Sequence, residues 1–500
     1  MSKREILSQT RFGHRVAEEE QDQLSSYFVE TDQWARVFNG EIDVVFGPKG
    51  SGKSAIYALL LSRANDLFDS QVLLASAENP QGTPAFQGII EDPPTSEAEF
   101  RGLWKLYFLS LISRVLDEYG IKDENSRALK RVLEDEGLLP PAKGLQGVLS
   151  AARFYVSRAF RAQAVEGGVE LDPLTGVARA IKGKIIFADP TPPDRERGFS
   201  SVDELLSLAN ESFNQAGYEL WLLLDRLDVA FAEHEELERN ALRALFRVYL
   251  DLAGHQRIHL KIFLRSDIWD KLAAQGFREA SHITKQVTIT WDESSLLNLI
   301  VRRALRNEAI QQHLAVDPVA IIASLDAQAQ FFYRLFPNQV DVGEKKPSTL
   351  DWIISRTRDG LKRTAPREVI HLLNSLREVQ IARIEKGQPE PEGELLFERI
   401  TFKEALREVS SSKVNQTLLA ENPSLSEYVL RLRGQKATQY PQSIASIWGL
   451  SEEDARGVSD QLAKAGFFEV RELNGQPEYW VPFLFRDALE LVQGAAELEE

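Results

Sequence analysis

Cysteine is absent from the 500 residues, and no segment approaches the ~18 consecutive apolar residues that a membrane-spanning helix requires. The lack of cysteine excludes disulfides, thiolate zinc sites and cysteine nucleophiles. The apolar run YELWLLL has only the length of a strand. The opening segment MSKREILSQTRFGHRV lacks the unbroken apolar stretch of a signal peptide. We therefore expect a cytoplasmic protein with no membrane partner.

Basic residues are outnumbered by acidic ones, with 59 Lys+Arg against 75 Asp+Glu and a formal net charge of −16. This balance argues against a protein that coats nucleic acid over its whole surface, although it leaves room for a local basic groove. Hydrophobic residues make up 43% of the chain and charged residues 27%, as in ordinary globular proteins. The length suffices for roughly three domains of about 150 residues each.

Up to about residue 290, apolar runs alternate with segments of helical periodicity. The first 40 residues are polar and helical in pattern. Strands that alternate with helices form a parallel sheet with helices on both faces. A hairpin near residues 171–176 is a weaker expectation. The strands expected are 42–46, 70–76, 183–188, 218–228 and 258–267, and the helices are 54–68, 97–120, 123–165 with a break at Pro140-Pro141, 202–216 and 235–253.

Beyond residue 290 the pattern is helical as far as about 385, with a break in the segment 336–349. After the linker EKGQPEPEGE, residues 440–482 read as helix, turn, helix and two strands joined through Asn474-Gly475, which is a winged-helix pattern. The predicted domains are 1–290, a core with an N-terminal helix and a helical insertion, 291–390, a helical lid, and 396–500, the winged helix.

One segment has the spacing of a phosphate-binding loop. GPKGSGKS, residues 47–54, fits G-x-x-x-x-G-K-[ST] between a predicted strand and a predicted helix. The glycines let backbone N–H groups wrap a phosphate chain, and the next helix directs its positive N-terminus at the same anion. Lys53 is expected to reach the β- and γ-phosphates, and the Ser54 hydroxyl to ligate Mg²⁺. The residues expected to bind the nucleotide are Gly47, Pro48, Lys49, Gly50, Ser51, Gly52, Lys53, Ser54 and Ala55.

A phosphate-binding loop also needs a carboxylate that holds Mg²⁺ through its waters at the end of a buried strand. The segment LWLLLDRLD supplies Asp225 directly after an apolar run and Asp228 three residues later. We assign Asp225 to the metal and Asp228 to the general base that polarises the attacking water. The alternative is that both carboxylates lie in a solvated loop.

Two arginines are candidates for the nucleotide site. Arg265 ends the next strand, in FLRSD, where it could neutralise the γ-phosphate or instead form an ion pair with Asp267. Arg367 follows Pro366, which suits the first turn of a lid helix, so its side chain could reach back to the phosphates or lie on the helix surface. A third arginine, Arg257, could project to a neighbouring subunit, although we favour an ordinary surface position.

These motifs resemble those of the STAND and KAP branch of the AAA+-related P-loop ATPases, and the chain is similar to bacterial ATPases built of core, lid and winged helix. The resemblance rests on FGPKGSGKS, LLLDRLD, IFLRSDIW and RTAPREVIHLLN, and covers roughly residues 25–385. In that superfamily the second carboxylate is often followed by glutamate or arginine, whereas Val229 stands here. The resemblance implies an α/β P-loop NTPase fold with a helical lid and a C-terminal winged helix. It also implies a switch or assembly ATPase in bacterial stress or antiviral defence.

The expected cofactors are ATP and Mg²⁺. Guanine specificity requires an [NT]-K-x-D segment, and TKQV at residues 284–287 lacks the aspartate. The chain contains no LSGGQ-like signature, no DExx box and no G-x-S-x-G elbow. Its seven histidines are dispersed and form no HExxH pair, so we expect no histidine metal site.

The winged helix decides between two functions. Its candidate recognition helix, residues 451–465, begins with Glu452, Glu453 and Asp454, and residues 401–500 contain 10 Lys+Arg against 16 Asp+Glu. Acidic residues at that end oppose contact with DNA phosphates. We therefore favour an ATP-hydrolysing switch that forms homo-oligomers and recruits a protein effector. The alternative is a nucleotide-regulated DNA-binding ATPase, and a small-molecule kinase ranks third.

Overall fold

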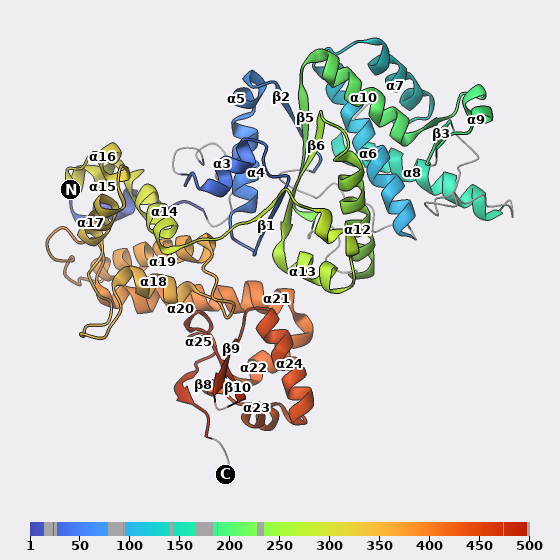
Figure 1. Ribbon diagram of the computed structural model, residues 1–500. Coiled ribbons are helices and arrows are strands. Elements are labelled where there is room, and N and C mark those ends of the chain that lie inside the picture. The colour runs from blue at the N-terminus through green and yellow to red at the C-terminus, as the bar shows by residue number, and fades with distance from the viewer. Residues whose placement is uncertain are drawn as a thin grey trace. The chain divides into compact units, whose positions relative to one another are not determined.

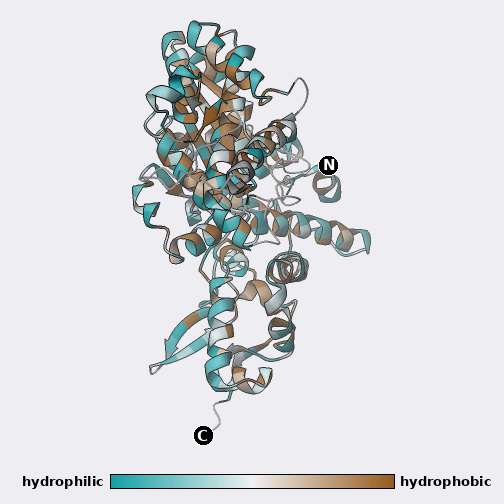
Figure 2. Cartoon of the chain, turned by 90° about the vertical axis from the view of Figure 1, so that its right-hand side faces the viewer, coloured by the Kyte–Doolittle hydropathy of each residue, from teal (hydrophilic) through white to brown (hydrophobic). Residues whose placement is uncertain are grey.

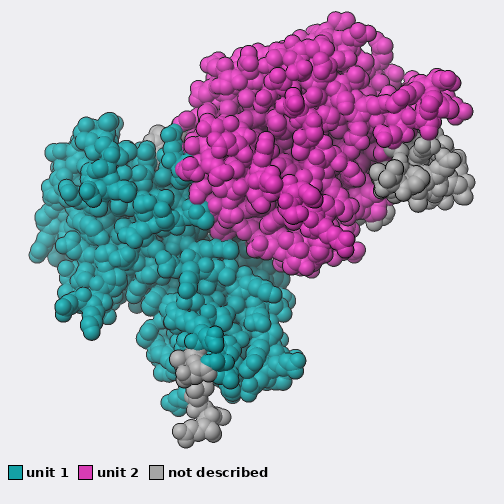
Figure 3. Space-filling view, in the orientation of Figure 1, with its two compact units in different colours: residues 1–31, 49–51, 290–500 teal, residues 32–48, 52–289 magenta. Residues whose placement is uncertain are grey.

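The computed structural model of the chain (Figure 1) describes residues 1–14, 24, 28–78, 94, 96–140, 144–165, 184–187, 189–227, 235–473 and 475–497. The chain forms two compact units (Figure 3). Unit 1 contains residues 1–31, 49–51 and 290–500, and unit 2 contains residues 32–48 and 52–289. Unit 2 thus ends next to the predicted boundary at 290, while residues 1–31 belong with the helical region that follows it.

Unit 2 is built on a five-stranded parallel sheet, as the alternation of strands and helices predicted. The strand order is β2-β5-β6-β1-β7. The inner strands are nearly continuous apolar runs because a sheet covered by helices is buried on both faces. The edge strand β7 was not predicted, since it is short and its two end residues are exposed. The strands are β1 (Val44–Gly47), β2 (Val72–Ser76), β5 (Glu219–Leu224), β6 (Ile258–Arg265) and β7 (Gln286–Thr288).

Helices cover both faces of this sheet. Figure 1 shows α4 and α5 on one side and α6 and α12 on the other. The predicted helix 202–216 is confirmed as α10, which Ser201 caps and Gly217, at φ 77°, ends. The helices of unit 2 are α3 (Asp32–Phe38), α4 (Lys53–Ser62), α5 (Ala64–Asp69), α6 (Glu97–Glu118), α7 (Glu124–Asp135), α8 (Gly144–Val165), α9 (Pro192–Glu196), α10 (Val202–Ala216), α12 (Glu235–Leu252), α13 (Ser266–Ala274) and the 3₁₀ turn η3 (Arg278–His282).

The core of unit 2 packs the large side chains of α6 against α10, α12 and the sheet. Trp104, Tyr107 and Phe108 of α6 are fully buried there. Coloured by hydropathy (Figure 2), the strands of the unit 2 sheet are mostly brown and the outer helix surfaces mostly teal. Within the described residues, the strand predicted at 183–188 is reduced to β3 (Ile185–Ile186), which pairs with β4 (Ser200–Ser201). The hairpin predicted at 171–176 lies outside the described residues.

Unit 1 contains the helical region and the C-terminal segment. Its helix α1 contacts α15 and α19, which come more than 300 residues later. There Arg377 Nε donates to Leu7 O at 2.7 Å and Asn374 Nδ2 donates to Gly13 O at 2.8 Å. The helices before the C-terminal segment are α1 (Lys3–Gln9), α14 (Glu293–Leu305), α15 (Glu308–Leu314), α16 (Pro318–Ile322), α17 (Leu325–Leu335), α18 (Thr349–Thr357), α19 (Pro366–Glu385) and α20 (Arg399–Lys413).

The C-terminal segment has the predicted winged-helix arrangement. Two helices precede an antiparallel pair of strands, and a π-helical turn continues α20. The strands at 436–439 and 492–495, which were not predicted, complete a sheet of order β11-β8-β10-β9. The elements are η4 (Val414–Leu418), α21 (Leu419–Glu421), η5 (Pro423–Leu425), α22 (Ser426–Arg431), β8 (Lys436–Gln439), α23 (Pro441–Trp448), α24 (Glu452–Lys464), β9 (Glu469–Leu473), β10 (Gln476–Trp480), α25 (Phe483–Arg486) and β11 (Val492–Ala495).

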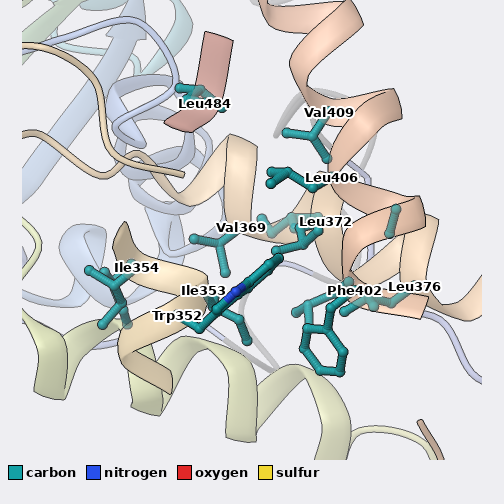
Figure 4. Close-up of a cluster of buried hydrophobic side chains, with 14 of the residues drawn as sticks. Trp352, Ile353, Ile354, Val369, Leu372, Leu376, Phe402, Leu406, Val409 and Leu484 are labelled. Carbon is teal, nitrogen blue, oxygen red and sulfur yellow. The ribbon is translucent and has the colours of Figure 1, made fainter. Parts of the chain in front are cut away.

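The predicted lid and winged helix share one hydrophobic core. Figure 4 shows Trp352 of α18 and Leu372 of α19 facing Phe402 and Leu406 of α20, with Leu484 of α25 at the same cluster. Residues on both sides of the predicted linker at 385–394 are therefore buried together. This part of the chain packs as a single body.

Alternating arginines and aromatic rings add to the contact between lid and winged helix. Arg356 of α18 lies 4.0 Å from the ring centre of Phe483, and Arg486 lies 4.2 Å from the same ring. Arg486 and Arg471 lie over Trp480 at 4.6 and 4.1 Å. Burial, together with the charges of Arg356 and Arg471, lowers the pKa of Arg486 to about 10.

A backbone contact joins the loop before α19 to the start of β9. Gly360 N donates to Gly466 O at 2.7 Å, and Lys362 lies 3.6 Å from the Glu469 carboxylate. A Cβ on Gly360 would lie 2.3 Å from Phe468 O, so only glycine fits there. No helix in the described part of the chain is long and apolar enough to cross a membrane.

Candidate nucleotide-binding site

The glycine-rich loop connects the end of β1 at Gly47 to the start of α4 at Lys53. Gly50 and Gly52 have φ values of 81° and 104°, in the left-handed region that side chains disfavour. Gly52 is the N-cap of α4, and no side chain caps the helix. The first N–H groups of α4 therefore face the loop, as an anion-binding loop requires.

Lys53 lies within the loop that precedes it. Its ammonium group donates to Gly47 O at 2.9 Å and to Pro48 O at 3.1 Å. These carbonyls hold the cation over the turn where the motif places the phosphates. The side chain is half-buried, so a bound anion would replace carbonyl contacts rather than bulk water.

Ser54 and Asp225, separated by 171 residues in sequence, are in direct contact. The Ser54 hydroxyl donates to Asp225 Oδ2 at 2.7 Å. Asp225 follows the last residue of β5 and is only 5% exposed. The structure therefore brings together the two residues assigned to the metal, on the first turn of α4 and at the carboxyl end of a buried strand.

The chain turns sharply after Asp225. Arg226 has a φ of 60°, a left-handed conformation that costs about 1 kcal/mol or more for a residue other than glycine. This turn ends the strand directly at the carboxylate. Asp228, assigned to the general base, lies outside the described residues, as does Val229, so that assignment stays a prediction.

Arg265 is paired in register with Gly47, at the neighbouring end of β6. Its guanidinium donates to both carboxylate oxygens of Asp267, from Nε at 3.0 Å and from Nη2 at 2.8 Å. Burial pushes the pKa of Asp267 upward, but the hydrogen bonds and charge of Arg265 outweigh it, so this pKa is lowered. The ion pair considered as the alternative is thus formed, beside the loop where the phosphate role was predicted.

Three side chains of unit 1 contact the loop residues that belong to the same unit. Arg367, on the first turn of α19 after Pro366, packs so closely on Gly50 that a Cβ there would lie 2.9 Å from Arg367 Cβ. The Trp291 indole donates to Ser51 O at 2.8 Å. Lys49 forms an ion pair with Glu421, which lies at the end of the continued helix α20. Sequence reasoning missed Trp291 and Glu421, because neither is near a motif.

Arg257, considered as an arginine finger, contacts Asn214 and Glu219 of its own chain. Its Nε donates to Asn214 Oδ1 at 3.2 Å, and its Nη1 lies 3.7 Å from the Glu219 carboxylate. These contacts match the ordinary surface position that we favoured.

The candidate recognition helix is confirmed as α24, capped by Ser451, which accepts from Asp454 N at 3.1 Å. Glu452, Glu453, Asp454 and Asp460 are exposed, as are Arg456 and Lys464. The surface that a major groove would meet therefore has more acidic than basic side chains. The acidic side chains in the first turn stabilise the helix through its dipole, and they repel DNA phosphates.

No protein-family profile matches the chain, and no curated protein matches it. Among solved structures, the Orc1 protein of Aeropyrum pernix in complex with DNA is similar at 11% identity and a TM-score of 0.37, over 95% of this chain and 96% of that one. The Orc2 protein of the same organism, in ADPNP–ADP complexes, is similar at 11% identity and a TM-score of 0.30, over 94% of each chain. The DNA and the nucleotides of those structures are ligands of those proteins, and this degree of similarity shows no family for this chain.

Proposed function

We propose that this chain binds and hydrolyses Mg-ATP and that the nucleotide acts as a conformational switch. The observation that carries the proposal is the 2.7 Å contact between Ser54 and Asp225 at the start of the loop helix. A glycine turn with no ligand has no need of a buried aspartate against its first helical turn. The same loop holds Lys53 over the turn where phosphates would lie.

The donor set fits Mg²⁺ and a nucleotide triphosphate. A hydroxyl and a carboxylate are hard oxygen donors, and Mg²⁺ is usually held by one or two protein oxygens together with substrate phosphates and waters. In the described part of the chain, no group of three or more His, Asp or Glu side chains forms a metal site by itself. This is consistent with a metal that arrives with its nucleotide. When bound, Mg²⁺ supplies charge neutralisation at the β- and γ-phosphates.

The side chains of the loop and its surroundings then have separate roles. Lys53 balances phosphate charge, and the N–H groups of the loop bind phosphate oxygens. We keep the sequence assignment of Arg367 to the same anion, and its contact with the loop residue Gly50 lies within unit 1. We assign Arg265 to the γ-phosphate side of the site through its position beside Gly47. The general base is Asp228 by the sequence assignment.

The switch acts through unit 1. Arg367 begins α19, and α19 shares its core with the winged helix, so a change at the loop residue Gly50 bears on one packed body. We further propose that the nucleotide-bound form assembles with copies of itself and recruits a protein effector. A role in bacterial stress or antiviral defence is part of the same proposal and rests on the sequence resemblance. The acidic surface of α24 gives no support to the DNA-binding alternative.

Calorimetry of Mg-ATP binding to Lys53→Ala tests the nucleotide site. The variant loses the hydrogen bonds that Lys53 is expected to donate to the β- and γ-phosphates. Two charge-assisted hydrogen bonds of about 1.5–3 kcal/mol each correspond to a loss of roughly 10²–10⁴ in the affinity for Mg-ATP. Lys130→Ala removes a lysine from an exposed ion pair on α7 and should leave the affinity unchanged. Undiminished affinity in Lys53→Ala would contradict the proposal. The mass of the wild-type particle with and without ATP-γ-S then tests the assembly.

A further inference from the structure

A second buried carboxylate, Glu78, lies at the same edge of the sheet as Asp225. It comes two residues after the end of β2 and is 1% exposed. β2 and β5 are neighbouring parallel strands, paired in constant register from Val72 with Glu219 to Ser76 with Leu223. Continued by two residues, this register sets Glu78 beside Asp225. Neighbouring strands are about 4.8 Å apart, so the two acids are adjacent.

The turn that contains Glu78 is fixed by main-chain contacts. Ala77 N donates to Leu223 O at 2.8 Å and so extends the strand pairing. The Tyr107 hydroxyl donates to Ala77 O at 2.7 Å, and the Tyr57 hydroxyl donates to Glu78 O at 3.3 Å. These bonds end on backbone carbonyls, which any residue at position 78 would supply. Burying an acid at such a position is costly.

Glu78 and Asp225 also share surroundings on α4. Tyr57 comes three residues after Ser54 and so lies on the same side of the helix. Burial is the main cause that raises the pKa of Tyr57, and the charges of Asp225 and Glu78 raise it further. The phenol thus stays protonated under the influence of both acids, one of which contacts the Ser54 hydroxyl assigned to the metal.

The carboxyl ends of parallel strands are where ligands bind in open α/β sheets. Asp225 accepts the Ser54 hydroxyl, and the next residue is Arg226, which turns the chain away from the strand. A general base in the residue directly after the metal aspartate is therefore excluded in this chain. Within the described part of unit 2, the buried acid that remains at this edge is Glu78. From the carboxyl end of β2, we expect the Glu78 carboxylate to face a water beside the γ-phosphate.

We infer that Glu78 is the general base of the ATP hydrolysis proposed above, and this inference rests on that proposed function. As the water oxygen bonds to the γ-phosphorus, its proton passes to the Glu78 carboxylate. The bond from the γ-phosphorus to the bridging oxygen breaks, and the electron pair leaves with ADP. The protonated acid then returns its proton to solvent. Asp225 keeps the role assigned to it at the metal and takes no proton in this step.

The test compares Glu78→Gln with Asp228→Asn in the full-length chain. Mg-ATP affinity is measured by calorimetry, and hydrolysis by single-turnover release of phosphate. In Glu78→Gln we expect wild-type affinity, an unchanged melting temperature and hydrolysis slower by about 10²–10⁴-fold. Glu136→Gln is the matched control, because it makes the same change at a carboxylate with a side chain only 10% exposed, at the C-cap of α7. Its rate should equal that of wild type.

The outcomes separate this inference from the proposed function. Hydrolysis at the wild-type rate in Glu78→Gln would overturn the inference and leave the ATPase intact. If Glu78→Gln fails to fold, the Asp228→Asn variant decides between the two acids. Hydrolysis near the wild-type rate in Asp228→Asn supports Glu78 as the base. A loss of rate of about 10²–10⁴-fold in Asp228→Asn with ATP still bound assigns the base to Asp228 and overturns the inference. A wild-type chain that binds ATP and never hydrolyses it overturns both. A wild-type chain that binds no ATP refutes the proposed function at its first step.

Discussion

Replacement of Gly360 by alanine should disturb the packing of the lid loop against the winged helix and destabilise unit 1. The added Cβ would lie 2.3 Å from Phe468 O and 2.5 Å from Phe468 C, whereas real Cβ atoms essentially never approach within 3.0 Å. Both neighbours are backbone atoms that no rotamer change can move aside. The loop must therefore shift by at least about 0.7 Å, and the 2.7 Å hydrogen bond from Gly360 to Gly466 lengthens beyond the usual range.

The expected cost follows from these two effects. Overpacking a tight contact costs about 1–3 kcal/mol, and the lost hydrogen bond contributes about 1 kcal/mol. We expect a destabilisation of about 2–4 kcal/mol, which lowers the melting temperature of a unit of this size by roughly 4–16 °C. Unit 2 should be unaffected, because Gly360, Gly466 and Phe468 all belong to unit 1.

Gly457→Ala is the matched control, with the same chemical change in the same unit. Gly457 is exposed in the middle of α24, and nothing lies within 4 Å of a Cβ placed there. Alanine in a helix interior is favoured over glycine by about 0.5–1 kcal/mol, so this variant should be more stable. Differential scanning calorimetry measures both variants, and limited proteolysis assigns each transition to a unit. A Gly360→Ala protein as stable as wild type would refute the close packing of the loop on β9.

Three further predictions concern the site and its partners. Asp225→Asn should weaken ATP binding in the presence of Mg²⁺ and much less in EDTA, because the amide loses the charge that favours the metal; equal losses under both conditions would contradict this. Arg265→Ala should slow hydrolysis, whereas Asp267→Ala should not, provided that the arginine acts on phosphate; similar losses in both variants would assign Arg265 to the ion pair alone. The full-length chain should show no saturable binding of a labelled DNA duplex in fluorescence anisotropy at physiological salt, and submicromolar binding that weakens steeply with salt would reverse our ranking of the two functions.

Most of the α/β fold follows from apolar runs that local physics explains. β2, β5 and β6 lie within predicted segments, and β1 overlaps its predicted segment except for Gly47, because buried parallel strands are continuous apolar runs. β7 was not predicted because Gln286 and Thr288 lie at an exposed edge of the sheet, where strand residues need not be apolar and so leave no apolar run in the sequence. β8, with the sequence KATQ, is similarly short and polar. The place of residues 1–14 in unit 1 depends on contacts with α15 and α19, and no local pattern contains that information.

The site divides in a similar way. The loop spacing indicates Lys53 and Ser54 directly. The apolar run before Asp225 indicates that this carboxylate ends a buried strand, so the sequence alone assigns Ser54 and Asp225 to the same metal. Glu78 carries no motif. It becomes a candidate only when β2 is known to lie beside β5, because two acids that follow different strands are neighbours only in the folded sheet. Arg265 has a position that spacing can suggest, but its ion pair with Asp267 depends on side-chain geometry.

The two-part composition of unit 1 has a consequence for biosynthesis. α1 leaves the ribosome before unit 2, yet Leu7 O accepts its hydrogen bond from Arg377, which is 370 residues away in sequence. At about 5–20 residues per second, this partner is made roughly 20–70 s later. The whole of unit 2 can fold during that interval, while Ile6 and Leu7, both buried in the finished protein, have nothing to pack against. The residues of α1 therefore reach their native contacts only after those of unit 2, and we expect nascent chains to be most vulnerable to proteases and to need chaperones during this interval.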